Sequence, residues 1–349
     1  MTAAAISAAF ATQAAACDNL GSPFMGRLMR LCATQGWPDG AVTDRIYGWS
    51  GDLGPSGQSV PLRLAGALHA LHLQGNATLA QVYPPRCTDD VTLWAAVAKV
   101  LVSEEAAILR WLDSPPQTNE VRRSAPLIAL GHWLADRYAL PLRCSELGAS
   151  AGLNLHWDDY ALEIGGQHFG PATPALTLAP DWTGPLPPAA RPQVSARAGV
   201  DLNPLDPRDP DDTLRLQAYL WPDQPDRLAL TQAAMANART PIAKGDAIDW
   251  LSNRLDHHAG QTHLVYTTIA WQYFPAAVQA QGAAMIHAAG QTARKDAPLA
   301  WFGMEPDGAG PGAALTLRLW PGDLTFALGR ADFHGRWVHW TPDQTTKKD

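Results

Sequence analysis

The sequence lacks the features that mark several classes of protein. Its 349 residues include four cysteines, none in a Cys-x-x-Cys pair, so we expect no metal site and no disulfide framework. No run of lysine or arginine exceeds two residues and the net charge is −7, which argues against nucleic acid and a membrane surface as partners. No apolar stretch reaches about 18 residues, which predicts a soluble, cytoplasmic protein. A small molecule is the expected partner, and the oligomeric state stays open.

The composition is that of a packed globular chain, and its patterns divide the chain in two. Hydrophobic residues make up 46% and charged residues 17%, enough apolar side chains for a sizeable core. Helical patterns fill the first third: the spacing of Ile6, Phe10, Ala14 and Cys17, then residues 61–74, 88–112 and 125–138. A break at Pro115 precedes the last of these. We predict an N-terminal helical cap over 1–115 and a second domain over 116–349.

From residue 142 onward, strand patterns alternate with helical patterns. The expected strands are residues 142–147, 195–201, 241–244, 262–269, 298–305, 314–320 and 337–340. The expected helices between them are residues 211–238, broken by two prolines, 247–255 and 275–289. A hairpin around Gly165 and Gly166 belongs to an insertion over about 160–194. The alternation predicts an α/β domain with a mostly parallel sheet and helices on both faces.

The most specific motif is Glu146-Leu147-Gly148-Ala149-Ser150-Ala151-Gly152, directly after the first strand. In a nucleotide-binding sheet, an acid and then small residues form a turn that lets the backbone approach the ligand, and the following helix presents free N–H groups. Candidate cofactor-binding residues are therefore Glu146, Gly148, Ser150 and Gly152, with Ser150 standing where a glycine is usual. The same residues also fit a Gly-x-Ser-x-Gly nucleophile elbow, in which Ser150 attacks the substrate.

Polar residues at the next two strand ends favour the nucleotide-binding interpretation. Asp201 and Asn203 follow the second expected strand, where an acid can bind ribose hydroxyls, and Asp246 and Ala247 follow the third. Asp201 lies 49 positions after Gly152 (201 − 152), compared with a usual spacing of about 20, so this interpretation requires the insertion. We predict that one pocket at the carboxyl edge of the sheet is lined by Glu146, Gly148, Gly152 and Asp201.

The hydrolase alternative needs a downstream acid and a downstream histidine. Candidates are Asp323 or Asp332 with His334 or His339. No His-Gly-Gly motif precedes the first strand to form an oxyanion hole, and Glu146 places a charge close to the supposed nucleophile. The sequence therefore permits a hydrolase without indicating one.

Seven polar and aromatic residues are candidates for substrate binding. They are Gln117, Asn119, Glu120, Asn154, Trp271, Gln272 and Tyr273. The first three lie in a segment too polar for a plain linker, just before the helix that leads into the first strand. The last three follow a later strand end, where ligands of open α/β sheets bind. If the helical part covers the pocket, Asn119 and Glu120 reach the acceptor.

Six blocks of the chain carry a family resemblance. They are residues 117–120, 146–155, 201–206, 220–224, 271–273 and 304–308. In these blocks the chain resembles an uncharacterised bacterial family, domain of unknown function 2332, over nearly its whole length. The resemblance implies that the part from about Glu120 onward is similar to class I S-adenosylmethionine-dependent methyltransferases. Residues 267–273 lack the Asn/Asp-Pro-Pro-Tyr segment of enzymes that methylate base amino groups, so that activity is not expected.

The residues and this resemblance together favour methyl transfer from S-adenosylmethionine to a small-molecule acceptor. The expected fold is a class I methyltransferase-like (Rossmann-like) sheet with the N-terminal helical cap. Such chemistry asks mainly that the protein hold nucleophile, methyl carbon and leaving sulfur in line, so no catalytic residue is predicted. Two alternatives stay open: a non-catalytic binding protein that keeps only the nucleotide fold, and a serine hydrolase that uses Ser150.

Overall fold

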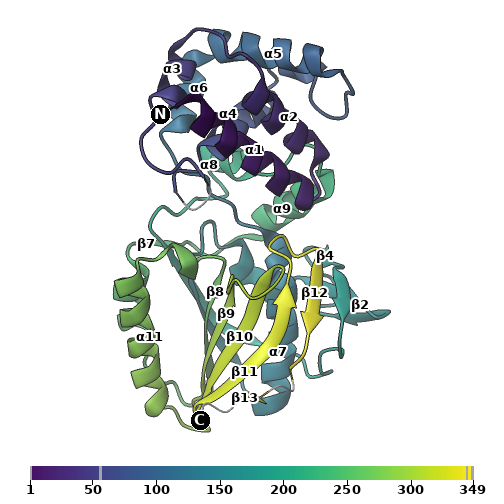
Figure 1. Cartoon of the computed structure of the whole chain (residues 1–349). Helices are drawn as coiled ribbons and strands as arrows, with labels where there is room; N and C mark the ends of the chain where they lie inside the picture. Colours follow the sequence, from purple (N-terminus) through teal and green to yellow (C-terminus); the bar gives the residue numbers. More distant parts are fainter. Residues whose placement is uncertain (1, 55–56, 343–344, 347–349) are drawn as a thin grey trace. The chain divides into compact units, whose positions relative to one another are not determined.

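The computed structural model describes residues 2–54, 57–342 and 345–346, and the chain divides into two compact units (Figure 1). The first unit combines Met1–Thr118 with Asp209–Ala229, and the second combines Asn119–Arg208 with Leu230–Asp349. The boundary expected at residue 115 lies close to the first division. The expectation differs from the structure for residues 209–229, which the sequence analysis places in the α/β domain.

The first unit is helical. Its helices are α1 (Ala3–Asn19), α2 (Pro23–Thr34), α3 (Ala41–Tyr47), α4 (Val60–Leu73), the 3-10 helix η1 (Leu79–Gln81), α5 (Asp90–Ser103), α6 (Glu105–Leu112) and α8 (Pro210–Ala218). The four residues at helical spacing in α1 are all buried, which confirms the amphipathic pattern of this segment. The helix expected over 88–112 is two helices, because the backbone leaves helical dihedral angles at Glu104 (φ −115°, ψ 24°).

Contacts between distant residues explain why residues 209–229 belong to the first unit. The His69 Nδ1 atom on α4 lies 3.2 Å from the carbonyl oxygen of Ala218, and Trp221 is part of the buried core of the helices. The Asp223 carboxylate accepts hydrogen bonds from the Ser22 hydroxyl and from a backbone amide of α2. The partners are 149 and 201 positions apart, so no local pattern could reveal them.

The described residues of the second unit contain a ten-stranded sheet. Its strands are β1 (Leu142–Leu147), β5 (Asp181–Thr183), β6 (Val194–Asp201), β7 (Ala243–Lys244), β8 (Thr262–Thr268), β9 (Leu299–Glu305), β10 (Ala313–Trp320), β11 (Leu324–Ala331), β12 (Trp337–Trp340) and β13 (Thr345–Thr346). Five neighbours are parallel, in the order β7–β6–β1–β8–β9, and β10, β11 and β12 continue the sheet as antiparallel strands. The mostly parallel α/β sheet expected from the sequence is therefore present.

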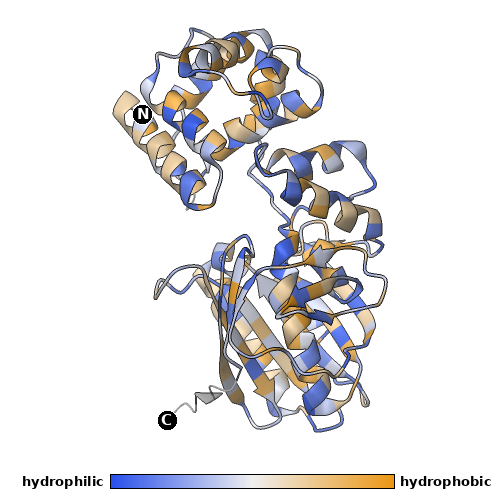
Figure 2. Ribbon diagram, turned by 90° about the vertical axis from the view of Figure 1, so that its right-hand side faces the viewer, coloured by the Kyte–Doolittle hydropathy of each residue, from blue (hydrophilic) through white to orange (hydrophobic). Residues whose placement is uncertain are grey.

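Helices cover both faces of this sheet. They are η2 (Val121–Arg123), α7 (Ser124–Tyr138), η3 (Leu153–Asp159), α10 (Ala247–Ser252), η4 (Trp271–Tyr273) and α11 (Ala276–Gln291), with α9 (Pro225–Asn237) spanning the division between the units. Leu147 and Val265 share a buried cluster with residues of α10 and α11 on one face. On the other face the Tyr266 hydroxyl donates to the Asn154 carbonyl oxygen of η3 at 3.2 Å. Figure 2 shows hydrophobic residues (orange) along these strands and helices.

Part of the insertion between β1 and β6 folds into a small separate sheet. It consists of β2 (Ala161–Ile164), β3 (Gln167–Phe169) and β4 (Thr177–Leu178). The antiparallel pairing of β2 with β3 confirms the hairpin expected around Gly165 and Gly166. None of the helices in the described ranges is long and apolar enough to cross a bilayer.

The order of the parallel strands indicates where a ligand would lie. Counted along the chain, β1, β6, β7, β8 and β9 are the first to fifth parallel strands, and their order in the sheet is 3-2-1-4-5. The chain order reverses between β1 and β8. In open α/β sheets, ligands bind beyond the carboxyl ends of the strands beside such a reversal. The candidate site is therefore the group of segments that follow β1, β6 and β8.

Candidate functional site

The loop after β1, residues 148–154, lies where the strand order reverses. Its backbone is left-handed at Gly148 (φ 72°), Ser150 (φ 53°) and Gly152 (φ 70°). This conformation is strained for a residue with a Cβ atom, so the surroundings must hold Ser150 in place. The helix expected after the motif is η3, a 3-10 helix kinked at His156, in place of an α-helix with free N–H groups. The strand and turn of the expected βα unit are therefore present, but the α-helix that should follow them is replaced by η3.

The amide groups of the loop are bound within the protein. Gly148 and Ala149 both donate to one carbonyl oxygen of β6, at 2.9 and 3.0 Å. The Ser150 amide donates to Asp201 Oδ2 at 2.8 Å, and the Asn203 amide donates to Asp201 Oδ1 at 2.9 Å. Asp201 therefore lies beside the loop as predicted, and each of its carboxylate oxygens already accepts one backbone hydrogen bond.

Asn119 holds the second half of the loop. Its Oδ1 atom accepts hydrogen bonds from the amides of Ala151 at 3.2 Å and Leu153 at 3.0 Å. The side chain is buried, and both contacts fix the loop against the segment that precedes α7. Asn119 therefore positions the loop, whereas the sequence pattern predicts that it binds the substrate.

Asn154 and Glu120 belong to the same buried connection. The Asn154 Nδ2 atom donates to the Glu120 carbonyl oxygen at 3.2 Å, and the Ser124 hydroxyl donates to Asn154 Oδ1 at 2.7 Å. The Glu120 carboxylate accepts the Arg122 amide at 3.2 Å. Both side chains are almost fully buried, and Asn154 connects the loop to the main chain of Glu120 and to Ser124.

The two glycines of the loop leave space that the protein itself fills. A Cβ atom on Gly148 would lie 2.5 Å from the Ala270 Cβ atom. A Cβ atom on Gly152 would lie 2.4 Å from the Ile242 Cδ1 atom. The motif predicts that a ligand occupies this space. In the structure, the glycines instead permit the close approach of the segments after β8 and before β7.

A buried acid, Glu146, lies near the carboxyl end of β1. It is 1% exposed, and its Oε2 atom has no hydrogen-bond partner among the described residues. Burial first, and the nearby Asp201 second, raise the pKa of this carboxyl well above its usual value, while Arg123 acts in the opposite direction. A carboxyl group in this position is costly to the fold unless a ligand or water engages it.

Two further charged residues at this edge are not among the residues predicted from the sequence. Glu305 ends β9, and its Oε1 atom accepts two backbone amides of the segment after β8, each at 3.1 Å. Its Oε2 atom has no partner in the described part of the chain. Arg123 donates to the Thr268 carbonyl oxygen at the end of β8 at 3.1 Å, and its charge acts on both acids. The missed signal is an acid that ends a predicted strand.

Of the remaining predicted residues, Asp246 and Ala247 have structural roles in α10. Asp246 is the exposed N-cap of α10, where it accepts the amides of Ile248 at 2.8 Å and Asp249 at 3.1 Å. Ala247 is the first residue of that helix and packs in the buried core. Gln117 belongs to the first unit. A capping role accounts for the Asp246 side chain without a ligand.

The aromatic segment after β8 divides into a packed part and an exposed part. Trp271 lies against Trp301 of β9, with ring centroids 5.5 Å apart, so it stabilises the fold. Gln272 and Tyr273 are exposed, Tyr273 by 69%. On the other side of the loop, Leu202 after β6 is 63% exposed. The carboxyl edge therefore presents apolar surface on both sides of the loop.

Ser150 lacks the partner that a nucleophilic serine requires. Its hydroxyl is buried and has no hydrogen-bond partner within the part of the chain that the structure describes. A triad serine hydrogen-bonds to a histidine. The candidate acids Asp323 and Asp332 form ion pairs with arginines, and His339 contacts a threonine hydroxyl at 2.8 Å. This geometry gives the hydrolase alternative no support.

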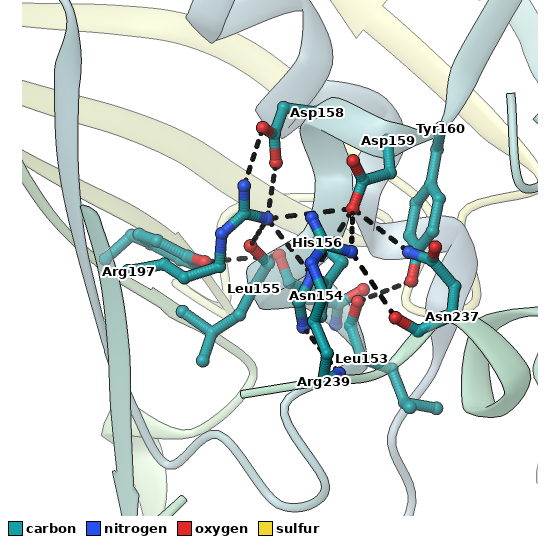
Figure 3. Close-up of polar contacts among 11 residues, drawn as sticks. Leu153, Asn154, Leu155, His156, Asp158, Asp159, Tyr160, Arg197, Asn237 and Arg239 are labelled. Atoms are coloured by element: carbon teal, nitrogen blue, oxygen red, sulfur yellow. Dashed lines mark hydrogen bonds and ion pairs between the residues drawn. The ribbon is translucent and has the colours of Figure 1, made fainter. Parts of the chain in front are cut away.

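A second polar cluster connects η3 with β6 (Figure 3). Arg197 on β6 donates to both carboxylate oxygens of Asp158, at 2.7 and 2.9 Å. The side chains of this pair are only 15% and 14% exposed. Asp159 beside them accepts hydrogen bonds from Asn237 at 3.0 Å and Arg239 at 2.6 Å. The cluster therefore connects η3 with β6 and with the segment after α9 through charged hydrogen bonds.

His156 lies buried in the same cluster and is neutral. Burial first, then the charges of Arg197 and Arg239, lower its pKa to about 4. Its Nε2 atom accepts the Arg239 amide at 3.3 Å, and its Nδ1 atom lies 3.1 Å from Arg197 Nη1 and 3.4 Å from Asp159 Oδ2. Because both ring nitrogens are engaged within the protein, this histidine is a structural connection.

Replacing Glu146 by glutamine should raise stability. The folded state raises the Glu146 pKa, so it retains a proton that the unfolded chain releases, and stability falls as pH rises between the two pKa values. Glu146→Gln keeps the shape and removes the charge, so we expect the free energy of unfolding at neutral pH to rise by about 1–3 kcal/mol. Urea unfolding across acidic to neutral pH measures this. The exposed Glu163→Gln is the control; a loss of stability in Glu146→Gln would contradict the argument.

The comparisons with known proteins identify a family. Among the described residues, no group of three or more His, Cys, Asp or Glu side chains could hold a metal ion. No curated protein and no solved structure matches the chain. A bacterial family matches residues 7–340, which is nearly the whole chain. The chain therefore belongs to the family described as "Uncharacterized protein conserved in bacteria (DUF2332)".

Proposed function

We propose that the carboxyl edge of the parallel strands binds S-adenosylmethionine and that the protein transfers its methyl group to a small-molecule acceptor. The observation that carries this proposal is the strand order. The Glu146–Gly152 turn follows the first strand of a 3-2-1-4-5 set, beside the reversal where such sheets bind nucleoside ligands. The sequence resemblance to class I methyltransferases agrees with this placement.

The polar groups left over at this edge suit a ligand with donors and positive charge. The loop amides donate within the protein, so they do not form a cradle for a phosphate. Acceptor atoms of Glu146, Ser150 and Glu305 have no partner among the described residues. S-Adenosylmethionine carries an ammonium group, a positively charged sulfonium and two ribose hydroxyls. Its donors and charge therefore complement the acceptors at this edge.

The chain's own residues would act by binding and orientation. Glu146 would hold the positive end of the ligand, and Asp201 has a lone pair left on each carboxylate oxygen for ribose hydroxyls. Leu202 and Tyr273 would contact the acceptor. The bound cofactor would supply an activated methyl group, so the protein's main task would be to align the acceptor with it.

Calorimetry with S-adenosylmethionine and S-adenosylhomocysteine tests the proposal. We expect both to bind, and Glu146→Gln to weaken S-adenosylmethionine by about tenfold or more, because a glutamine cannot release a proton to form the carboxylate that the bound positive charge would stabilise. S-Adenosylhomocysteine lacks the sulfonium charge, so its affinity should fall less in Glu146→Gln than that of S-adenosylmethionine. Ser150→Gly should change either affinity by less than about tenfold, the value of one hydrogen bond. Absence of binding by the unaltered protein would refute the proposal.

Two further measurements separate the alternatives. Binding of both ligands without transfer of a labelled methyl group to any of a set of small metabolites would favour a non-catalytic binding protein. Labelling of Ser150 by a fluorophosphonate, with loss of the label in Ser150→Ala, would restore the hydrolase. The exposed Glu163→Gln serves as the control for the loss of a carboxylate.

A further inference from the structure

A cluster of basic side chains lies on β1 and β8, towards the ends opposite the candidate site. Arg143 on β1 is paired in register with His263 on β8, so their side chains lie on the same face of the sheet. The His263 Nε2 atom lies 2.9 Å from the Ser145 hydroxyl oxygen, and the Arg254 Nε atom donates to the same oxygen at 3.3 Å. Three separate segments thus bring two guanidinium groups and an imidazole together.

The positive charge of this cluster is not balanced by ion pairs within the described ranges. Arg143 donates to a backbone carbonyl oxygen, that of Asp256, at 3.1 Å, and Arg254 lies over a tryptophan ring. The Asp256 carboxylate acts on Arg143 from a distance. The other titratable groups that act on His263 are all basic: Arg143, Arg254, His257 and His258. The cluster is therefore electrically suited to an anion.

His263 adds a buried donor without an acceptor. It is 4% exposed, and burial first, then Arg143 and Arg254, lower its pKa to about 3, so the ring is neutral. With the Ser145 hydroxyl as the donor to Nε2 and its oxygen as the acceptor from Arg254, the ring proton resides on Nδ1. Nδ1 has no partner among the residues that the structure describes. A buried N–H group in native proteins is rarely left in this state.

We propose that Arg143, Arg254 and His263 bind a doubly charged oxyanion, namely a phosphate group that is free or carried as a monoester by a small molecule. The two guanidinium groups offer paired N–H donors that match phosphate oxygens. The imidazole N–H would donate a further hydrogen bond to the same anion. The site lies towards the opposite ends of the strands from the proposed methyl-donor site. It uses none of the residues assigned to that site, so the two proposals can be tested independently of each other.

Titration calorimetry at constant ionic strength tests this site with inorganic phosphate and with glycerol 3-phosphate as the monoester. We expect saturable binding of at least one by the full chain, weakened about tenfold or more in Arg143→Gln and Arg254→Gln. The exposed Arg208→Gln should bind as the unaltered protein does. Tighter binding of the monoester identifies a small-molecule phosphate, and tighter binding of phosphate identifies the free ion. Equal affinity in all variants, or no saturable binding, overturns the proposal.

A second measurement does not depend on how the variants fold. In the unaltered protein with ¹⁵N-labelled histidine, phosphate should shift the ring nitrogen resonances of His263, assigned by their loss in His263→Asn. The bound anion should also raise the pKa of His263, because it stabilises the charged ring. Resonances of His263 that stay unchanged at saturating phosphate would exclude its Nδ1 atom as a ligand and overturn the site.

Discussion

Replacing Arg197 by methionine should lower the free energy of unfolding by about 3–5 kcal/mol at neutral pH. The change removes both hydrogen bonds to Asp158 and leaves that carboxylate buried without its cation. Asp158 then becomes easier to protonate, so its folded pKa rises further above the unfolded value and stability falls as pH increases. Urea unfolding at acidic and neutral pH should show a smaller difference from the parent protein at the lower pH.

A double variant separates the lost charge pair from lost packing. Arg197→Met with Asp158→Leu removes the unpaired carboxylate as well, so it should recover part of the stability that Arg197→Met loses. Arg208→Gln, which breaks the exposed pair with Asp206, should cost less than about 1 kcal/mol and serves as the surface control. A loss in Arg197→Met as small as this control would show that the cluster in Figure 3 does not stabilise η3.

Replacing Gly152 by valine should lower the free energy of unfolding by about 2–5 kcal/mol, with or without a ligand. The left-handed backbone (φ 70°) is strained for a β-branched residue, and the new Cβ atom would lie 2.4 Å from Ile242. Chemical unfolding measures the loss.

Gly166 provides a matched control for this change. It has nearly the same backbone conformation (φ 71°), and no atom lies within 4 Å of the position of its Cβ atom. Gly166→Val therefore reports the backbone strain alone, about 1–3 kcal/mol. If Gly152→Val unfolds like Gly166→Val but no longer binds S-adenosylhomocysteine, the space at Gly152 belongs to the ligand, as the sequence pattern suggests.

Local pattern is sufficient to predict the strands of the parallel half of the sheet. The expected ranges of β1, β6, β8 and β9 agree with the structure to within one residue, and β7 begins two residues later than expected. The strand β11 is not expected, because its alternation is interrupted. The register shifts between Leu315 and Thr316 on its partner, and Gly329 on β11 has a φ of 119°. A bulge of this kind hides the period of two on which strand prediction depends.

The roles of the polar residues at the site follow from contacts that no local pattern contains. The motif correctly places Glu146 and the loop at the carboxyl edge of the parallel strands, and Asp201 beside it. Asn119 instead meets loop amides 32 and 34 positions away, and Glu305 joins the site because β8 and β9 are neighbours. A buried polar group must find a partner, and whether that partner is the chain itself or a ligand depends on which segments the folded sheet brings together.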